Sequence, residues 1–340
     1  MRYSTAIDPS TGLVRLSDEN AGLQGSVAPA RGAELSSLRH RFQGDWVETL
    51  YRANEFTEPD HGWRGRAPAL WPAVGRNFTG EHSQELQRTG DYDGICTYVQ
   101  EERTWEIPRH GFAMHMPWEL QSHTADSSGA TVVCALGSDD ETREQYPFDF
   151  ELSVRFLLAD GALRMTYRVA SRSDGLPFSI GNHLSFRLPF GRAGRFEDIV
   201  IWGPIEKQQE TTEAGLFSGR ELELDLRRGA RLGWERLHNG VFGPVPPDNA
   251  CVELWQEGAF GFRVSQRALD PTDARLYFVF YAQPLDGLFC PEPWLGGPNS
   301  LNTREGVVTL AAGESFSWEM TIEPLPEAGE LSFDPADVPS

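Results

Sequence analysis

Between Phe150 and Val169 the chain alternates apolar with polar residues, so that every second side chain would lie on the same face of a β-strand. An Asp160-Gly161 pair divides this stretch into two runs, and such a pair favours a tight turn between antiparallel strands. The sequence therefore predicts a β-hairpin here. Its apolar face is formed by Phe150, Leu152, Val154, Phe156 and Leu158 in the first run, and by Leu163, Met165, Tyr167 and Val169 in the second.

Short runs of strand-forming residues recur along the rest of the chain. The alternation returns at 261–267 and 315–323, and shorter apolar runs occur at 12–16, 23–28, 34–38, 118–123, 130–136 and 222–226. No stretch sustains the period of about 3.6 residues that marks an amphipathic helix. We therefore predict an all-β fold, a large antiparallel β-sandwich. It would comprise one domain over residues 1–325, including a long ordered loop over 58–72, and a Pro- and acid-rich tail over 326–340.

Charge and composition exclude several classes of partner. The formal charge of −20 repels polyanions, so we expect no nucleic acid. The N-terminus lacks the basic start and apolar segment of a secretory signal, and no apolar run is long enough to cross a bilayer, so we expect a cytoplasmic protein with no membrane partner. The four cysteines lie far apart, which predicts buried free thiols and no metal site.

The stretch from Leu276 to Asn302 combines a core strand with a candidate catalytic acid. Its first six residues are apolar or aromatic throughout, which predicts a strand that is buried on both faces. The prolines and glycines that follow predict a stiff loop, in which Glu292 lies between two prolines and beside Trp294. A pre-positioned carboxylate next to an indole suits a sugar-handling base. The alternative is an exposed acid in a Pro-rich turn.

Familiar catalytic signatures are missing from the sequence. It contains no Gly-rich phosphate loop, no HExxH and no Gly-x-Ser-x-Gly motif. Histidine and carboxylate therefore remain as candidates for the chemistry. His110 opens a His-Gly-Phe motif, and His183 follows Gly181-Asn182 at the end of an apolar run. Each histidine, taken singly, could equally be a satisfied core or turn residue.

Taken together and in order, these motifs resemble the aldose 1-epimerase (galactose mutarotase-like) family. The motifs are Trp-Pro-x-x-Gly-Arg ending at Arg76, His-Gly-Phe-Ala at His110, Asn-His-x-x-Phe at His183, and Glu-Pro-Trp at Glu292, followed by Gly-Gly-Pro-Asn-Ser-Leu-Asn. The resemblance implies a β-sandwich with a sugar cleft. It also implies catalytic roles for His183 and Glu292, and sugar-binding roles for His110 and Arg76.

The family reaction fits these residues. A base removes the proton of the anomeric hydroxyl while an acid protonates the ring oxygen, and after rotation about C1–C2 the ring closes again. We expect Glu292 to be the base, because a carboxylate is ordinarily ionised at neutral pH, and His183 to be the acid. Trp294 and Asn182 are predicted to contact the substrate. The reaction needs no cofactor, and the only partner expected is a small sugar, bound by a monomer or homodimer.

Several alternatives remain open at this point. The same fold serves hexose-6-phosphate mutarotases, and a non-catalytic carbohydrate-binding protein would keep the cleft without turnover. Arginines and acids share the segment 60–109, and because neighbouring acids can neutralise the arginines, we predict a neutral aldose as the substrate. Two departures from the family pattern affect sugar specificity. Leu184-Ser185 follows the Asn-His pair, and a sugar-binding aspartate has only Asp225 and Asp248 as candidates.

Overall fold

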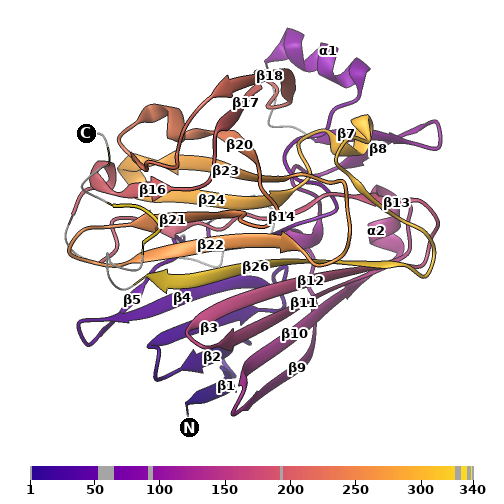
Figure 1. Cartoon of the computed structure of the whole chain (residues 1–340). Helices are drawn as coiled ribbons and strands as arrows, with labels where there is room; N and C mark the ends of the chain where they lie inside the picture. The colour runs from indigo at the N-terminus through magenta and orange to yellow at the C-terminus, as the bar shows by residue number, and fades with distance from the viewer. Residues whose placement is uncertain are drawn as a thin grey trace.

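The computed structural model describes residues 2–52, 65–90, 95–191, 194–325, 331–334 and 338. Within these ranges most residues of regular structure lie in antiparallel strands, and the three α-helices are short. The predicted all-β class is confirmed. Figure 1 shows the two largest sheets stacked, with the strands β20, β23 and β24 above β22 and β26.

The larger sheet has nine strands and contains the predicted hairpin. β11 and β12 pair in continuous register from Phe150–Ser171 to Ala159–Ala162, so the turn falls at Asp160-Gly161 as predicted. In spatial order the strands are β19 (Ala230–Arg231), β16 (Val200–Trp202), β21 (Cys251–Trp255), β22 (Gly261–Ala268), β26 (Ser315–Leu325), β12 (Ala162–Ser171), β11 (Phe150–Ala159), β10 (Gly129–Gly137) and β9 (Glu119–Asp126).

A second sheet of eight strands carries the candidate site. Its order is β18 (Phe217–Glu223), β17 (Lys207–Thr211), β20 (Asn239–Val245), β23 (Leu276–Gln283), β24 (Leu288–Leu295), β14 (Ile180–Asn182) and β6 (Ala69–Leu70), with β15 (Phe186–Arg187) also paired to β24. An N-terminal sheet comprises β1 (Tyr3–Ile7), β2 (Val14–Asp18), β3 (Leu23–Ala28), β4 (Glu34–Phe42) and β5 (Asp45–Glu48). Two short pairs join β7 (Cys96–Gln100) to β8 (Arg103–Ile107) and β13 (Leu176–Phe178) to β25 (Val308–Leu310).

Strand β23 is buried on both faces, as predicted from its unbroken apolar run. Phe278 and Phe280 point into the main core, which is one contiguous cluster of apolar side chains running from Tyr3 to Ile322. Tyr277 and Val279 point the opposite way, into a smaller apolar cluster that also contains Trp294. This second face is the one on which the candidate catalytic carboxylate lies.

The predicted loop around Glu292 is wrong, because these residues form strand β24. Its register with β23 is unbroken from Leu288 to Leu295 despite two prolines. Pro291 and Pro293 are two residues apart, so their missing N–H groups fall on the same edge of the strand. On the edge facing β14 and β15 the pairing is interrupted between residues 289 and 294, which leaves room for prolines without breaking the ladder to β23.

Two smaller predictions also need correction. The helix α1 (Gly80–Thr89) was not predicted, because among its residues with described side chains it buries one apolar residue, Leu86, and so shows no apolar periodicity. The run at 222–226 is only partly a strand, since β18 ends at Glu223. The other helices are α2 (Asp140–Gln145) and α3 (Ser300–Thr303).

Some predictions fall partly outside the described residues. These are the loop at 58–72, of which 65–72 is described, and the tail at 326–340; the division into a domain and a tail stays a prediction. The four cysteines are free and buried, as predicted. No helix in the described ranges combines the length and apolar character needed to span a bilayer.

Candidate active site

Strand β24 positions the carboxylate of Glu292. Glu292 pairs with Val279 of β23, and Trp294 pairs with Tyr277, so both side chains leave the strand on the same face. Only 2% of Glu292 is exposed. A carboxylate so deeply buried needs polar partners, and the indole N–H of Trp294 supplies one by donating to Oε2 at 3.1 Å.

His183 lies beside this carboxylate, at the point where β14 ends. Its Nε2 is 3.4 Å from Oε1 of Glu292, and the histidine is 6% exposed. The backbone around His183 is fixed on both sides. Its own N–H donates to the carbonyl of Pro68, and its carbonyl accepts from the hydroxyl of Ser185. The structure therefore brings together the two residues predicted to be the acid and the base.

His110 lies next to this pair, and two hydrogen bonds with Gly75 hold it there. The N–H of Gly75 donates to Nδ1 of His110, and the N–H of His110 donates to the carbonyl of Gly75. Because Nδ1 accepts a hydrogen bond, the neutral ring carries its proton on Nε2. The His110 ring lies 5.5 Å from that of His183 and 5.8 Å from that of Trp294, between ring centroids. His110 can thus offer an N–H donor to a ligand at the pair.

The Gly-Gly-Pro-Asn-Ser-Leu-Asn segment holds the backbone around Arg76. The N–H of Asn299 donates to the carbonyl of Arg76, and its side-chain oxygen accepts from the N–H of Phe78. The hydroxyl of Ser300 donates to that of Ser179, which in turn accepts from the N–H of Val74. This part of the motif, whose role the sequence did not predict, is a scaffold for the segment that carries Arg76.

Two of the predicted substrate contacts have another role in the structure. The amide of Asn182 is fully buried and donates to the carbonyl of Ala67 and to the hydroxyl of Tyr167. Asn182 therefore supports the backbone that leads into His183, and its contact with the sugar stays a prediction. Trp294 is only 4% exposed, and its indole N–H is already used by Glu292. The indole thus supports the carboxylate through its N–H and packs in the smaller apolar cluster, and a contact with the sugar stays a prediction.

Burial opposes the protonation states predicted from ordinary pKa values. Desolvation raises the pKa of Glu292 well above its usual value, although the hydrogen bond from Trp294 and the charge of Arg109 oppose this shift. Desolvation lowers the pKa of His183 to about 3. It also lowers the pKa of His110 well below its usual value, and the nearby His183 and Arg109 add to that effect. Burial therefore favours the neutral forms of all three groups.

Arg109, one of the arginines of the segment 60–109, was not predicted as a site residue, but its charge acts on the site. Its positive charge acts on Glu292, His183 and His110, whereas Arg76 acts on His110 among these three. Its position immediately before His110 was the available signal. Neither predicted aspartate shows a contact with the pair, since Asp225 is paired with Arg227 and Asp248 is exposed.

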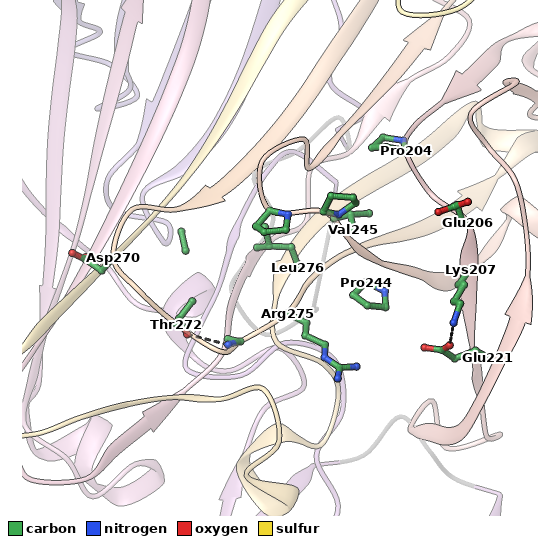
Figure 2. A pocket seen from close by; sticks show the side chains of 14 residues that line it. Pro204, Glu206, Lys207, Glu221, Pro244, Val245, Asp270, Thr272, Arg275 and Leu276 are labelled. Carbon is green, nitrogen blue, oxygen red and sulfur yellow. Dashed lines mark hydrogen bonds and ion pairs between the residues drawn. The ribbon is translucent and has the colours of Figure 1, made fainter.

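A pocket at another place on the molecule is shown in Figure 2. It has a volume of about 680 Å³, and four prolines form part of its wall. Lys207 and Glu221 form an ion pair at its side, and Arg275 points into the space beside Pro244. Neither Glu292, His183 nor His110 lines it. In the part of the chain that the structure describes, no three His, Cys, Asp or Glu side chains converge in a metal-binding group.

Comparison with known proteins agrees with this geometry. Residues 91–241, which include His110 and His183, match the family model of aldose 1-epimerase. The resemblance to the aldose 1-epimerase family is confirmed. Two curated relatives, from Salmonella typhimurium and Escherichia coli K12, carry the name "Putative glucose-6-phosphate 1-epimerase". They are 42% and 40% identical to this chain over 50 residues, which is 15% of this chain and 17% of each relative.

Solved structures resemble the chain over most of its length. The galactose mutarotase-like protein from Clostridium acetobutylicum superposes with a TM-score of 0.74 and 17% identity, covering 96% of this chain and 98% of that one. The galactose 1-epimerase from Lactobacillus acidophilus NCFM gives 0.70 and 16%, covering 96% and 99%. At such identities the likeness shows the fold, the galactose mutarotase-like β-sandwich.

Proposed function

We propose that this protein interconverts the α and β anomers of a free aldose, with Glu292 as the base and His183 as the acid. The observation that supports this most strongly is the 3.4 Å separation of their side chains at a buried position. The anomeric hydroxyl and the ring oxygen are both bonded to C1. An acid and a base that serve these two oxygens in one step must therefore lie close together.

The neutral resting state is compatible with these roles. A protonated Glu292 beside a neutral His183 holds one proton, and an ionised Glu292 beside a protonated His183 holds one as well. The proton can pass between the two side chains without changing the total charge of the pair. The N–H of Trp294 and the charge of Arg109 both lower the pKa of Glu292, so they favour the carboxylate that acts as the base.

During turnover the pair exchanges protons with the sugar in both directions. Glu292 takes the proton of the anomeric hydroxyl while His183 gives one to the ring oxygen, and ring closure on the other face of C1 reverses both transfers. His110, with its proton on Nε2, can donate to a sugar oxygen and hold the ring in place. A positioned acid or base contributes roughly 10²–10⁴ in rate, and that range suits a reaction that proceeds slowly without catalyst.

Polarimetry on freshly dissolved α-aldoses tests the proposal. We expect the protein to accelerate mutarotation of at least one sugar in a panel containing α-glucose and α-galactose. The Glu292→Gln variant, added at the same concentration, should leave the rate at the uncatalysed level. Binding of an aldose without any acceleration would favour the carbohydrate-binding alternative.

A phosphorylated hexose is the second candidate substrate. Arg109 acts on the pair and on His110 through its charge, Arg76 acts on His110, and guanidinium groups suit phosphate. The names of the two curated relatives point the same way. A higher kcat/KM for glucose 6-phosphate than for glucose, falling as salt rises, would favour this candidate over the neutral aldose predicted from the sequence.

A further inference from the structure

A second buried pair of opposite charges lies behind the catalytic histidine. Oε1 of Glu34, in β4, is 3.2 Å from Nη1 of Arg66. Glu34 is 7% exposed and Arg66 is 6% exposed. Buried ion pairs contribute little net stability, because desolvating both charges offsets their attraction, and in some proteins they instead specify the geometry of the groups around them. The effect of this pair therefore depends on the backbone groups to which Glu34 and Arg66 are attached.

The backbone of Arg66 connects this pair to His183. The carbonyl of Arg66 accepts the N–H of Ser185, whose hydroxyl donates to the carbonyl of His183. Two residues along the chain, the carbonyl of Pro68 accepts the N–H of His183 itself. Arg66 also adopts a φ of +67°, a left-handed conformation that costs energy for a residue with a side chain and needs surrounding contacts to maintain it.

On its other side the same segment is attached to strand β4. The N–H of Ala67 donates to the carbonyl of Leu35, and the ion pair lies directly next to this bond, between Glu34 and Arg66. The segment 66–68 is thus anchored to β4 by one backbone bond and one ion pair, and it holds the backbone of His183 by hydrogen bonds. A displacement of Arg66 would therefore reach His183 directly, through the backbone hydrogen bonds of Arg66 and Pro68.

We propose that Glu34 and Arg66 are positioning residues that set the placement of His183 relative to Glu292. Neither touches the pair directly, and they act through the segment 66–68. This inference rests on the proposed function, because it assigns a purpose to the placement of His183. A misplacement of about 1 Å can reduce a rate by around a hundredfold, so a small displacement would suffice.

The charges around Glu34 determine how the pair depends on pH. Burial raises the pKa of Glu34 to about 7, while the charges of Arg66 and Arg31 oppose that shift. Arg66 in turn faces Glu34, Arg31 and Arg52. The carboxylate is therefore formed, and the ion pair completed, as the pH rises through about 7. Glutamine has nearly the size of a protonated glutamate and keeps an oxygen that can accept from Arg66, so we expect Glu34→Gln to fold.

The test compares Glu34→Gln with Asp18→Asn in the full-length protein. Asp18 is a matched control, because it is a buried carboxylate of the same N-terminal sheet and is paired with Arg2. At about pH 8 we expect Glu34→Gln to lower kcat by at least about tenfold with KM within about twofold of the wild type. The wild-type kcat should rise between about pH 6 and pH 8, and the variant should lack this rise. Asp18→Asn should leave kcat unchanged.

A measurement that does not need activity separates this inference from the proposed function. The NMR signal of the His183 ring should shift in Glu34→Gln and stay in place in Asp18→Asn. If the wild type accelerates no aldose, the proposed function fails while the ring signal still tests the positioning. Unchanged kcat, pH profile and His183 signal in Glu34→Gln would overturn the inference, and so would an equal loss of kcat in Asp18→Asn.

Discussion

Replacing Trp294 by phenylalanine removes the hydrogen bond that supports the buried carboxylate of Glu292. The indole N–H donates to Oε2 at 3.1 Å and lowers the pKa of the acid. A hydrogen bond to a charged group contributes about 1.5–3 kcal/mol, so its loss should disfavour the carboxylate by that amount. With about 1.4 kcal/mol per factor of ten, kcat should fall by about ten- to a hundredfold. KM should change little, because the lost contact is with Glu292 and not with the sugar.

The assay is anomer exchange followed by NMR at several substrate concentrations, which gives kcat and KM separately. Trp318→Phe is a suitable control. Trp318 is also fully buried, and its indole N–H donates to Gln266 at 3.2 Å in strands β26 and β22. Both substitutions leave a cavity and reduce stability, but only the one at Trp294 should reduce kcat. An unchanged kcat with a raised KM for Trp294→Phe would show that the indole acts as a sugar platform, contrary to our reasoning.

Three further predictions concern the acid, the base and the buried pair. Glu292→Gln should abolish mutarotation and leave the thermal midpoint nearly unchanged. If the variant kept more than about a tenth of the wild-type rate, Glu292 could not be the base, because a tenfold loss raises the activation free energy by only about 1.4 kcal/mol. In steady-state kinetics His183→Asn should lower kcat far more than it raises KM, whereas His110→Asn should weaken binding as well. If the His110 change lowered kcat more than the His183 change, the roles of acid and sugar-binding residue would have to be exchanged. Because the folded-state pKa of Glu34 is raised from 4.5 to about 7, its contribution to stability is complete below the unfolded value and is lost as pH rises through about 7. Thermal melts should show this loss in the wild type and not in Glu34→Gln. If the thermal midpoint changed equally with pH in both proteins, the raised pKa assigned to Glu34 would be contradicted.

The strands were predictable where their side chains alternate. The hairpin at 150–169 has one face in the core and one towards solvent, and this difference is visible in the sequence. Strand β24 was missed because it is buried on every side and contains Pro291 and Pro293, which usually end a strand. Only the incomplete pairing on one of its edges makes the prolines acceptable, and that depends on strands more than a hundred residues away.

The candidate site was predictable in its members but not in their protonation. Motif order identified Glu292, His183 and His110, which the fold brings together from distant segments. Their pKa values depend on burial, and the burial of a polar residue cannot be read from its neighbours in sequence. For the same reason Arg66 and Glu34, separated by 31 other residues, gave no signal of pairing in the sequence.

The cooperation of Glu292 and His183 is tested most directly by a double-mutant cycle. The rate of anomer exchange is measured for the wild type, Glu292→Gln, His183→Asn and the variant carrying both substitutions. If the two residues exchange protons with the same sugar in one step, removing either should cost about as much as removing both. The account therefore predicts a double variant no slower than the slower single variant. Losses that add in the double variant would mean that the two residues act independently, and would contradict the proposed mechanism.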